Sequence, residues 1–315
     1  MQESGPNNSH PDKGKPGYYL WATIPSKRNL KFLKALYAAQ PCIETARDQF
    51  LSTAIPKLSD YARESCEGLI TEQELLKAVN SMENNKSPGL GGLTINFYKH
   101  FWPLLGEKLT RVYNYAFQTG CLAVSQRRGV ITLLFKKGDR TQLKNWRPIT
   151  LLNTDYKILT KALANRLQQV LPLIDHSDQI ASKKWRTIID NTRLLHDFVT
   201  YANEKGIPLA LISVDQLKAF ERVSHEFLFK SLDKFGFGPN FIWRIQTIYN
   251  SASSSVKING WLTAFIHLER GLREGCALSM PLYVLTADTM AINIRANPKI
   301  HGIRLPRSQE ELKFD

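Results

Sequence analysis

The apolar run at residues 209–214, Leu-Ala-Leu-Ile-Ser-Val, constrains the fold most because it ends on a single acid, Asp215. Such a run predicts a buried strand. A carboxylate at the end of a buried strand is held rigidly by the sheet, which suits a charged ligand. The alternative is that Asp215 caps the helix that follows it, as aspartate often does. Taken alone, the run favours the cap, because a lone acid seldom marks a functional site.

The remaining elements mix strands and helices without a regular β-α-β alternation, which predicts an α+β fold. The pair Thr71 and Glu74 fits a capping box that opens a helix through Met82. The dipeptide Asn259-Gly260 between two strand-like runs predicts a hairpin. Strands are expected at 129–135, from 145, at 254–258 and at 261–266, a loop at 86–92, and helices at 94–119, from 154, at 188–202, 226–235, 241–251 and 279–295.

The positive charge is concentrated in one part of the chain. The formal net charge is +14, and residues 121–170 hold ten Lys or Arg against two Asp, which is ten minus two, or +8. We expect Lys157, Lys161 and Arg166 on the solvent side of the helix that begins near residue 154. A solvated surface normally mixes acids with its bases. The clustering therefore indicates a polyanionic partner, with nucleic acid first and an anionic membrane surface second.

Neither the cysteines nor the apolar runs indicate export. Cys42, Cys66, Cys121 and Cys276 are far apart and show no zinc-site or disulfide spacing. This favours a reducing, intracellular setting, without deciding between nucleus and cytoplasm. No apolar run approaches the ~20 residues that cross a bilayer, so no membrane partner is expected.

Several blocks, in a fixed order, carry a family resemblance. Residues 145–159, 215–220, 256–260 and 270–279 resemble successive blocks of the reverse transcriptases of non-LTR (LINE-type) retrotransposons. Lys86-Ser-Pro-Gly and the segment around Asp178 and Gln179 fit the same family. The resemblance covers about residues 45–315, and several ordered motifs are far more specific than any one of them.

The resemblance implies a right-hand polymerase fold, of which this chain holds the fingers and part of the palm but no thumb. The expected division is a disordered leader at 1–28, a helical N-terminal extension at 29–84, fingers at 85–205 and a partial palm at 206–315. An RNA template and a DNA primer strand are the implied partners, with a dNTP in an active relative.

The resemblance also assigns roles around the nucleotide. Two Mg²⁺ ions bound by three aspartates are expected for the family, and Asp215 matches the first of these metal-binding catalytic residues. Phe220 matches the aromatic gate beneath the incoming sugar, although from spacing alone it could be a core residue. Lys136, Lys137 and Arg147 match the triphosphate contacts, although exposed lysines also commonly protect strand edges.

The glycine-punctuated block at residues 270–279 matches the part of the family that lines the template and nucleotide pocket. It makes Arg270, Arg273 and Ser279 candidate template-binding residues. Gly275 is a candidate nucleotide-binding residue, because a glycine lets the backbone approach a base closely. A simple turn before a helix stays an alternative for Ser279.

The chain also departs from the family pattern. Glu274 stands where the family usually has Gln. The acid that follows Ala-Phe is Glu221 here, a milder change. The loop at 88–92 lacks its acid, Trp185-Arg186 replaces Gly-Arg, and Ala277 and Met280 replace prolines.

The paired aspartates of the family are missing from this sequence. No adjacent Asp-Asp occurs in the 315 residues, and the sequence ends where the Ala-Asp-Asp hairpin is expected. We therefore expect a truncated domain that is inactive as this chain, because two of three metal-binding aspartates are missing. The alternatives are a non-catalytic RNA- or DNA-binding fragment and an unstable retroelement relic.

Overall fold

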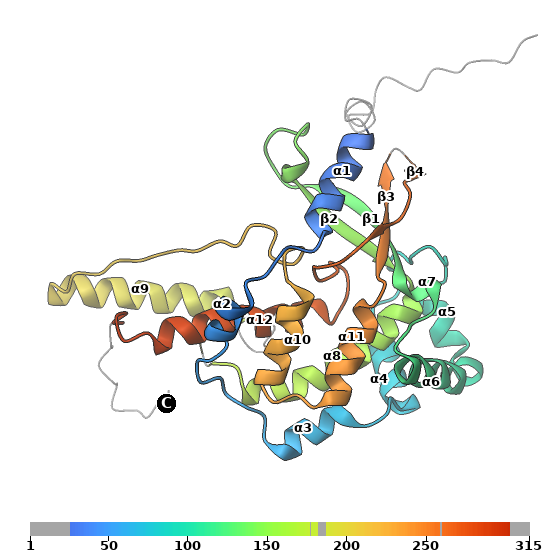
Figure 1. Ribbon diagram of the computed structural model, residues 1–315, viewed down its shortest axis with the longest axis horizontal. Helices are drawn as coiled ribbons and strands as arrows, with labels where there is room; N and C mark the ends of the chain where they lie inside the picture. The colour runs from blue at the N-terminus through green and yellow to red at the C-terminus, as the bar shows by residue number, and fades with distance from the viewer. Residues whose placement is uncertain (1–25, 177, 182–186, 259, 303–315) are drawn as a thin grey trace, which may run out of the picture.

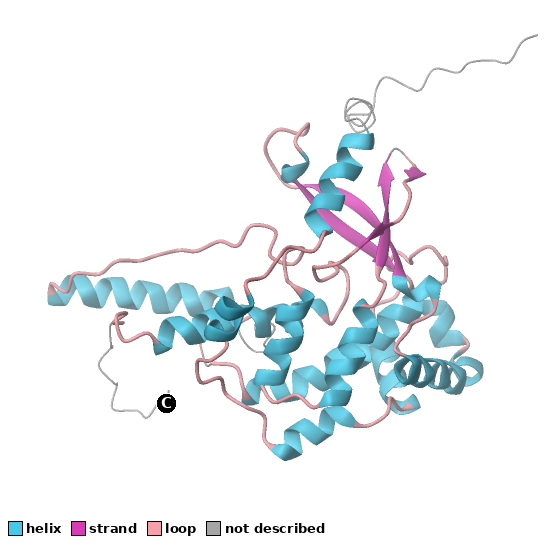
Figure 2. Ribbon diagram, viewed as in Figure 1, coloured by secondary structure: helices cyan, strands magenta, loops and turns pink. Residues whose placement is uncertain are grey.

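The computed structural model describes residues 26–176, 178–181, 187–258 and 260–302. A sheet stands on one side of a larger helical body (Figure 2), which confirms the predicted α+β class. The leader expected at 1–28 lies outside the described residues except for 26–28, which belong to the first helix. Within the described ranges, no helix is long and apolar enough to span a membrane.

The sheet joins segments that are far apart in the sequence (Figure 1). Strands β1 (Arg128–Phe135) and β2 (Trp146–Leu152) form an antiparallel hairpin, and β3 (Ser253–Ile258) runs parallel to β1. Two short strands, β4 (Trp261–Leu262) and β5 (Ile266–His267), pair antiparallel with β3. The strands predicted near 129–135, 145 and 254–258 are confirmed, and the one predicted at 261–266 is divided into two. Asn259 of the predicted turn lies outside the described residues.

Four helices form the N-terminal part, namely α1 (Ser26–Tyr37), α2 (Glu44–Phe50), α3 (Asp60–Glu67) and α4 (Glu72–Ser81). Helix α1 covers the sheet, where its Leu33 and Leu36 pack in one apolar cluster with Ile131 and Val256. The predicted capping box at the start of α4 is confirmed by reciprocal hydrogen bonds between residues 71 and 74.

The helix predicted over 94–119 is two helices, α5 (Ile95–His100) and α6 (Trp102–Thr119). Pro103 stands in the first turn of α6, where its missing N–H is tolerated, whereas inside one long helix it would remove a hydrogen bond. Gly120 ends α6 in the left-handed conformation with φ of 70°, as the sequence predicts.

Helix α8 (Thr154–Val170) follows the short α7 (Val124–Arg127) and the 3₁₀ turn at Leu143–Asn145, and it is buried on most sides. The expectation that Arg166 faces solvent is wrong. Its guanidinium bonds the Glu74 carboxylate and the carbonyls of Cys66, Gly68 and Leu69. Because α4 lies against this side of α8 and supplies the counter-charge, the arginine is buried rather than solvated. Lys157 and Lys161 are half-buried.

Three helices of the C-terminal half are close to the predicted ones. Helices α10 (His225–Lys234), α11 (Pro239–Tyr249) and α12 (Ser279–Ala296) pack around α8, and the 3₁₀ turn at Leu171–Leu173 ends that helix. Together with α3 to α6, these helices form the larger of the two apolar cores found among the described residues.

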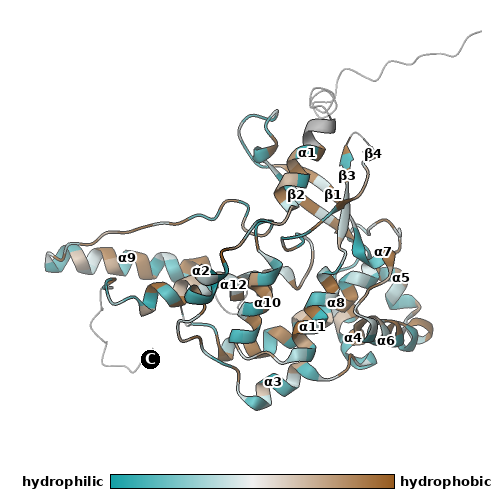
Figure 3. Cartoon of the chain, in the orientation of Figure 1, coloured by the Kyte–Doolittle hydropathy of each residue, from teal (hydrophilic) through white to brown (hydrophobic). Residues whose placement is uncertain are grey.

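The buried strand predicted at 209–214 is wrong. After α9 (Ile188–Lys205) the chain returns along that helix as an extended, unpaired segment (Figure 1), and Leu211, Ile212 and Val214 are 63%, 82% and 73% exposed. Figure 3 shows apolar residues on both α9 and this segment. A strand needs a neighbouring strand to satisfy its backbone, and the described residues place none beside this segment.

Candidate active site

The β1–β2 hairpin presents exposed basic side chains on a well-bonded turn. The Lys136 N–H donates to the Asn145 carbonyl at 3.0 Å, and the Trp146 indole N–H donates to the Arg140 carbonyl at 2.9 Å. The Lys136 and Lys137 side chains are exposed and form no ion pair within the described ranges. Six of the ten bases in 121–170 are exposed, all of them within 128–147, and the one acid there is Asp139. The exposed positive charge of this stretch is therefore confined to β1, β2 and the turn between them.

Two bases and two acids connect this hairpin to the segment at 218–221 and to the loop at 270–279. Arg147 on β2 lies with its Nε 3.8 Å from Oε1 of Glu274. The Lys218 ammonium donates to the Trp146 carbonyl at 2.8 Å and lies 3.9 Å from the buried Glu221 carboxylate. Burial raises the pKa of Glu274, the charge of Glu221 adds to this, and Arg147 and Lys218 oppose it. The acid that departs from the family pattern thus neutralises part of the charge of Arg147.

Asp215 lies at the end of the extended segment, close to the first turns of α12. The hydroxyl of Tyr283 donates to the side-chain oxygen of Gln216 at 2.7 Å. Burial raises the pKa of Tyr283, and the charge of Asp215 raises it further, so the two groups are neighbours. The ring of Phe220 stacks on Tyr283 with centroids 5.0 Å apart and planes at 30°. Tyr283 therefore packs on the candidate sugar gate and bonds the residue that follows the candidate metal ligand.

The loop at 270–279 is hydrogen-bonded both to β2 and to the segment that holds Phe220. Gly275 has φ of 100°, and a Cβ there would lie 2.6 Å from the Thr150 carbonyl oxygen of β2. The Thr150 N–H donates to the Glu274 carbonyl at 3.0 Å, and the Leu272 N–H donates to the Phe220 carbonyl at 2.8 Å. The close approach that the sequence assigned to a base is made in this structure to the backbone of β2.

The three candidate template residues use their side chains inside the chain. Arg270 donates from Nε to the Leu36 carbonyl at 2.8 Å, and Ser279 donates to the Arg273 carbonyl at 2.8 Å. Arg273 donates to the Arg127 carbonyl and lies over the ring of Tyr156. All three are buried, so they shape the loop, and a template could meet only what that loop exposes.

The described residues do not fit a pair of Mg²⁺ ions. They contain no group of three or more His, Cys, Asp or Glu side chains that could hold a metal ion. Asp288 of α12, which lies after the loop, is buried and paired with Arg295 at 3.2 Å. Mg²⁺ keeps its waters unless several anionic oxygens converge, and Asp215 supplies one carboxylate.

Comparison with known families shows to which family the chain belongs. The family described as reverse transcriptase (RNA-dependent DNA polymerase) matches residues 135–304, which is more than half of the 315 residues. The chain belongs to the reverse transcriptase family. The matched range contains Lys136, Arg147, Asp215, Phe220 and the loop at 270–279.

Relatives of this reverse transcriptase chain come from transposable elements, which confirms the resemblance to non-LTR retrotransposons. A Xenopus laevis protein named transposon TX1 uncharacterized 149 kDa protein is 43% identical over 268 residues, covering 85% of this chain and 20% of that protein. A Pol polyprotein from the type-1 retrotransposable element R2 of Popillia japonica is 27% identical over 54% of this chain and 24% of its own length. The R2DM polyprotein of Drosophila melanogaster is 23% identical over 73% and 21%. The chain therefore spans about a fifth to a quarter of the length of these relatives.

The structure brings some candidate residues together and adds others. Arg147 meets the loop that holds Gly275, whereas no contact in the described part of the chain joins Lys136 or Lys137 to Asp215. Sequence reasoning missed Lys218 and Tyr283. Lys218 lies inside the block at 215–220 and has positive φ of 54°, but its partner is 72 residues away in sequence. Tyr283 gave no sequence signal beyond its place on a predicted helix.

Proposed function

We propose that these 315 residues carry the fingers and the first part of the palm of a non-LTR retrotransposon reverse transcriptase, and that they do not catalyse nucleotidyl transfer by themselves. Under this proposal Asp215 is a metal ligand of the family's site. Phe220 limits the space at the sugar, and Lys136, Lys137 and Arg147 face the triphosphate. Gly275 shapes the nucleotide pocket, and Arg270, Arg273 and Ser279 fix the loop over which the template passes.

The observation that carries the proposal of inactivity is the isolation of Asp215. Nucleotidyl transfer by the two-metal mechanism needs ligands that hold both ions at once. Asp215 is exposed, and within the described ranges it belongs to no group of three or more His, Cys, Asp or Glu side chains that could hold a metal ion. When bound, such ions would stabilise the attacking and leaving oxygens. The residues of this chain contribute only contacts that hold the nucleic-acid strands and the phosphates.

Primer extension tests this proposal. An RNA template with an annealed DNA primer is incubated with the chain, dNTPs and Mg²⁺, and we expect no incorporation above the background without protein. Asp215→Ala serves as the matched control. Incorporation by the original chain that disappears in the Asp215→Ala variant would contradict the proposal.

A second candidate function, nucleic-acid binding without catalysis, is favoured by the exposed bases at 128–147. With six bases against one acid, this face carries six minus one, or +5. Binding through phosphate contacts falls steeply with salt, because each contact releases counterions. A salt titration of labelled RNA tests it, and weak binding that is insensitive to salt would remove this candidate.

The exposed apolar segment favours a third possibility, that the isolated chain does not fold stably. Val214 and Ile212 are among several large apolar residues left open to solvent there. Cooperative thermal unfolding of a soluble preparation would exclude it.

A further inference from the structure

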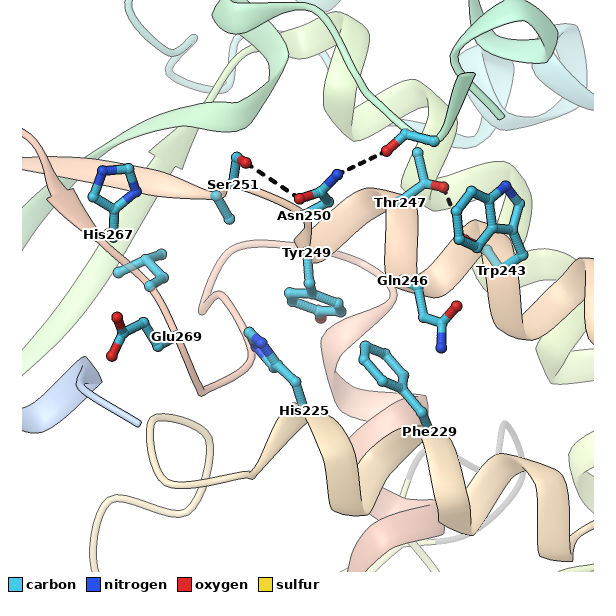
Figure 4. Close-up of a pocket in the computed structure, with 13 residues that line it drawn as sticks. His225, Phe229, Trp243, Gln246, Thr247, Tyr249, Asn250, Ser251, His267 and Glu269 are labelled. Atoms are coloured by element: carbon cyan, nitrogen blue, oxygen red, sulfur yellow. Dashed lines mark hydrogen bonds between the residues drawn. The ribbon is translucent and has the colours of Figure 1, made fainter. Parts of the chain in front are cut away.

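A cavity of about 530 Å³ lies between α10, α11 and the base of β3 and β5 (Figure 4). No residue assigned above to the nucleotide site lines it. Its lining includes three aromatic side chains and three polar ones, namely Trp243, Phe229, Tyr249, His225, Gln246 and Glu269. Its volume is in the range of small-ligand sites, roughly 300–1,000 Å³.

The aromatic wall is held rigidly although part of it is open to solvent. Trp243 is 46% exposed, yet its indole N–H donates to the Phe117 carbonyl at 2.7 Å. Gly120 lies so close that a Cβ there would meet the indole ring at 2.6 Å. The His225 ring lies 4.7 Å from that of Tyr249 and 6.2 Å from that of Phe229. An exposed indole fixed in place by a hydrogen bond is a preorganised stacking surface.

The polar groups of the cavity have unused hydrogen-bonding capacity. The Gln246 amide, which in Figure 4 lies between Phe229 and Trp243, makes no hydrogen bond within the described ranges. The contact of His225 Nε2 with the Gly271 carbonyl at 2.9 Å requires the proton on Nε2, which leaves Nδ1 as an acceptor. Burial lowers the pKa of His225 and keeps the ring neutral. Glu269 uses one oxygen for the Ala39 N–H at 2.7 Å.

The side chains that line the cavity indicate which class of ligand it can bind. Among the residues that the structure describes, no Lys or Arg lines the cavity, and Glu269 carries a negative charge, so a phosphate is disfavoured inside it. A purely apolar ligand would leave the Gln246 amide and the His225 acceptor without partners. A flat heteroaromatic ring suits the aromatic wall and the polar groups together. Its face can stack on Trp243 while its edge bonds the Gln246 amide. A glutamine amide pairs well with a ring that carries an exocyclic amine beside an acceptor nitrogen, as adenine does.

Positive charge lies beside the cavity rather than within it. Gly120 lines the cavity and directly precedes the basic stretch at 121–170. Arg128, Ser253 and His267 stand side by side across β1, β3 and β5 in the sheet register. Arg128 is exposed, and its guanidinium lies 4.4 Å over the ring of Phe265. A nucleic-acid strand that places one base in the cavity would therefore find a cation, Arg128, beside it for a neighbouring phosphate.

We propose that this cavity binds one base of single-stranded nucleic acid, with a base that carries an exocyclic amine preferred over uracil. The base stacks on Trp243 and bonds Gln246. This inference rests on the proposed nucleic-acid binding of the chain, and it adds a subsite that Asp215 does not line and that reads the base rather than the phosphate.

Binding of labelled RNA to the full chain tests the subsite. Oligoadenylate, oligouridylate and an abasic oligomer of equal length are compared by fluorescence anisotropy at one salt concentration. We expect oligoadenylate to bind best. Trp243→Ala should weaken its binding about ten-fold, in line with the loss of one stacked base. Gln246→Leu should reduce the preference for adenine over uracil about ten-fold, and neither variant should change binding of the abasic oligomer.

Matched variants separate this subsite from the fingers surface. Gln73→Leu replaces an exposed glutamine of α4 and should leave the adenine preference intact. Lys136→Ala with Lys137→Ala should weaken the binding of all three oligomers and keep the preference for adenine over uracil. If RNA binds with a steep salt dependence but Trp243→Ala and Gln246→Leu bind like the original chain, the subsite is refuted and the fingers surface stands. If no oligomer binds at all, the proposed nucleic-acid binding fails first.

Discussion

Replacing Gly275 by alanine should loosen the connection between the loop and the sheet. With φ of 100°, this residue lies where an L side chain is strained, and strain of this kind costs about 1–3 kcal/mol. The new methyl group would also meet the Thr150 carbonyl at 2.6 Å, which threatens the hydrogen bond from the Thr150 N–H to Glu274. Losing that bond adds about 0.5–1.5 kcal/mol. The expected loss of unfolding free energy is therefore about 2–4 kcal/mol.

Thermal unfolding followed by tryptophan fluorescence measures this loss. At about 2 °C per kcal/mol for a chain at the large end of single domains, Tm should fall by roughly 4–8 °C. Gly68→Ala is the control, because Gly68 has φ of −59° and no atom within 4 Å of its Cβ position. Both variants restrict the unfolded chain equally, so the difference between their Tm values measures the backbone strain and the steric clash at residue 275. Equal Tm values for the two variants would refute the reasoning.

Three further changes test other parts of the account. Arg166→Leu removes the guanidinium that donates to the Glu74 carboxylate and to three carbonyls, while Glu74 keeps its bonds from Thr71 and Cys66 keeps its bond from Arg244. It should cost about 3 kcal/mol, the low end for a broken buried pair, because the Glu74 side chain is 31% exposed. In urea unfolding, Lys161→Leu on the same helix should differ from the original chain by less than about 0.5 kcal/mol, and a similar loss in both would count against the pair. The pKa of Glu274 is raised in the folded state, so the folded chain binds more protons and stability falls as pH rises from 4.5 through that raised pKa. Glu274→Gln should therefore be more stable than the original chain at neutral pH, with the gain vanishing below pH 4.5, and a gain that grows on acidification would contradict this. Lys136→Ala with Lys137→Ala should reduce the slope of log affinity against log salt by about 1.4 for single-stranded RNA, and an unchanged slope would exclude both lysines as phosphate contacts.

The elements that could be predicted from sequence are those with local causes. Thr71 and Glu74 bond each other across one helical turn, and Gly120 ends a helix by its own backbone freedom, so neither depends on distant residues. The composition of the extended segment at 209–214 suits burial, and it therefore predicts a strand. A strand depends on a neighbour elsewhere in the chain, and the pattern of one segment does not show whether that neighbour is present.

The candidate site divides in the same way. Asp215, Phe220 and Arg147 belong to ordered blocks that a family resemblance can locate. Tyr283 matters because it stacks on Phe220 and bonds Gln216, which is a property of the folded chain. Arg166 was misplaced for the same reason, since its burial depends on Glu74, which lies 92 residues earlier in sequence.

Titration with Mn²⁺, a spectroscopic substitute for Mg²⁺, tests the role of Asp215 most directly. The electron paramagnetic resonance signal of free Mn²⁺ is followed while the ion is added to the chain with template, primer and dNTP. A lone carboxylate should leave the ion signal the same in the original chain and in Asp215→Asn. Uptake of two Mn²⁺ per chain that Asp215→Asn abolishes would contradict the account.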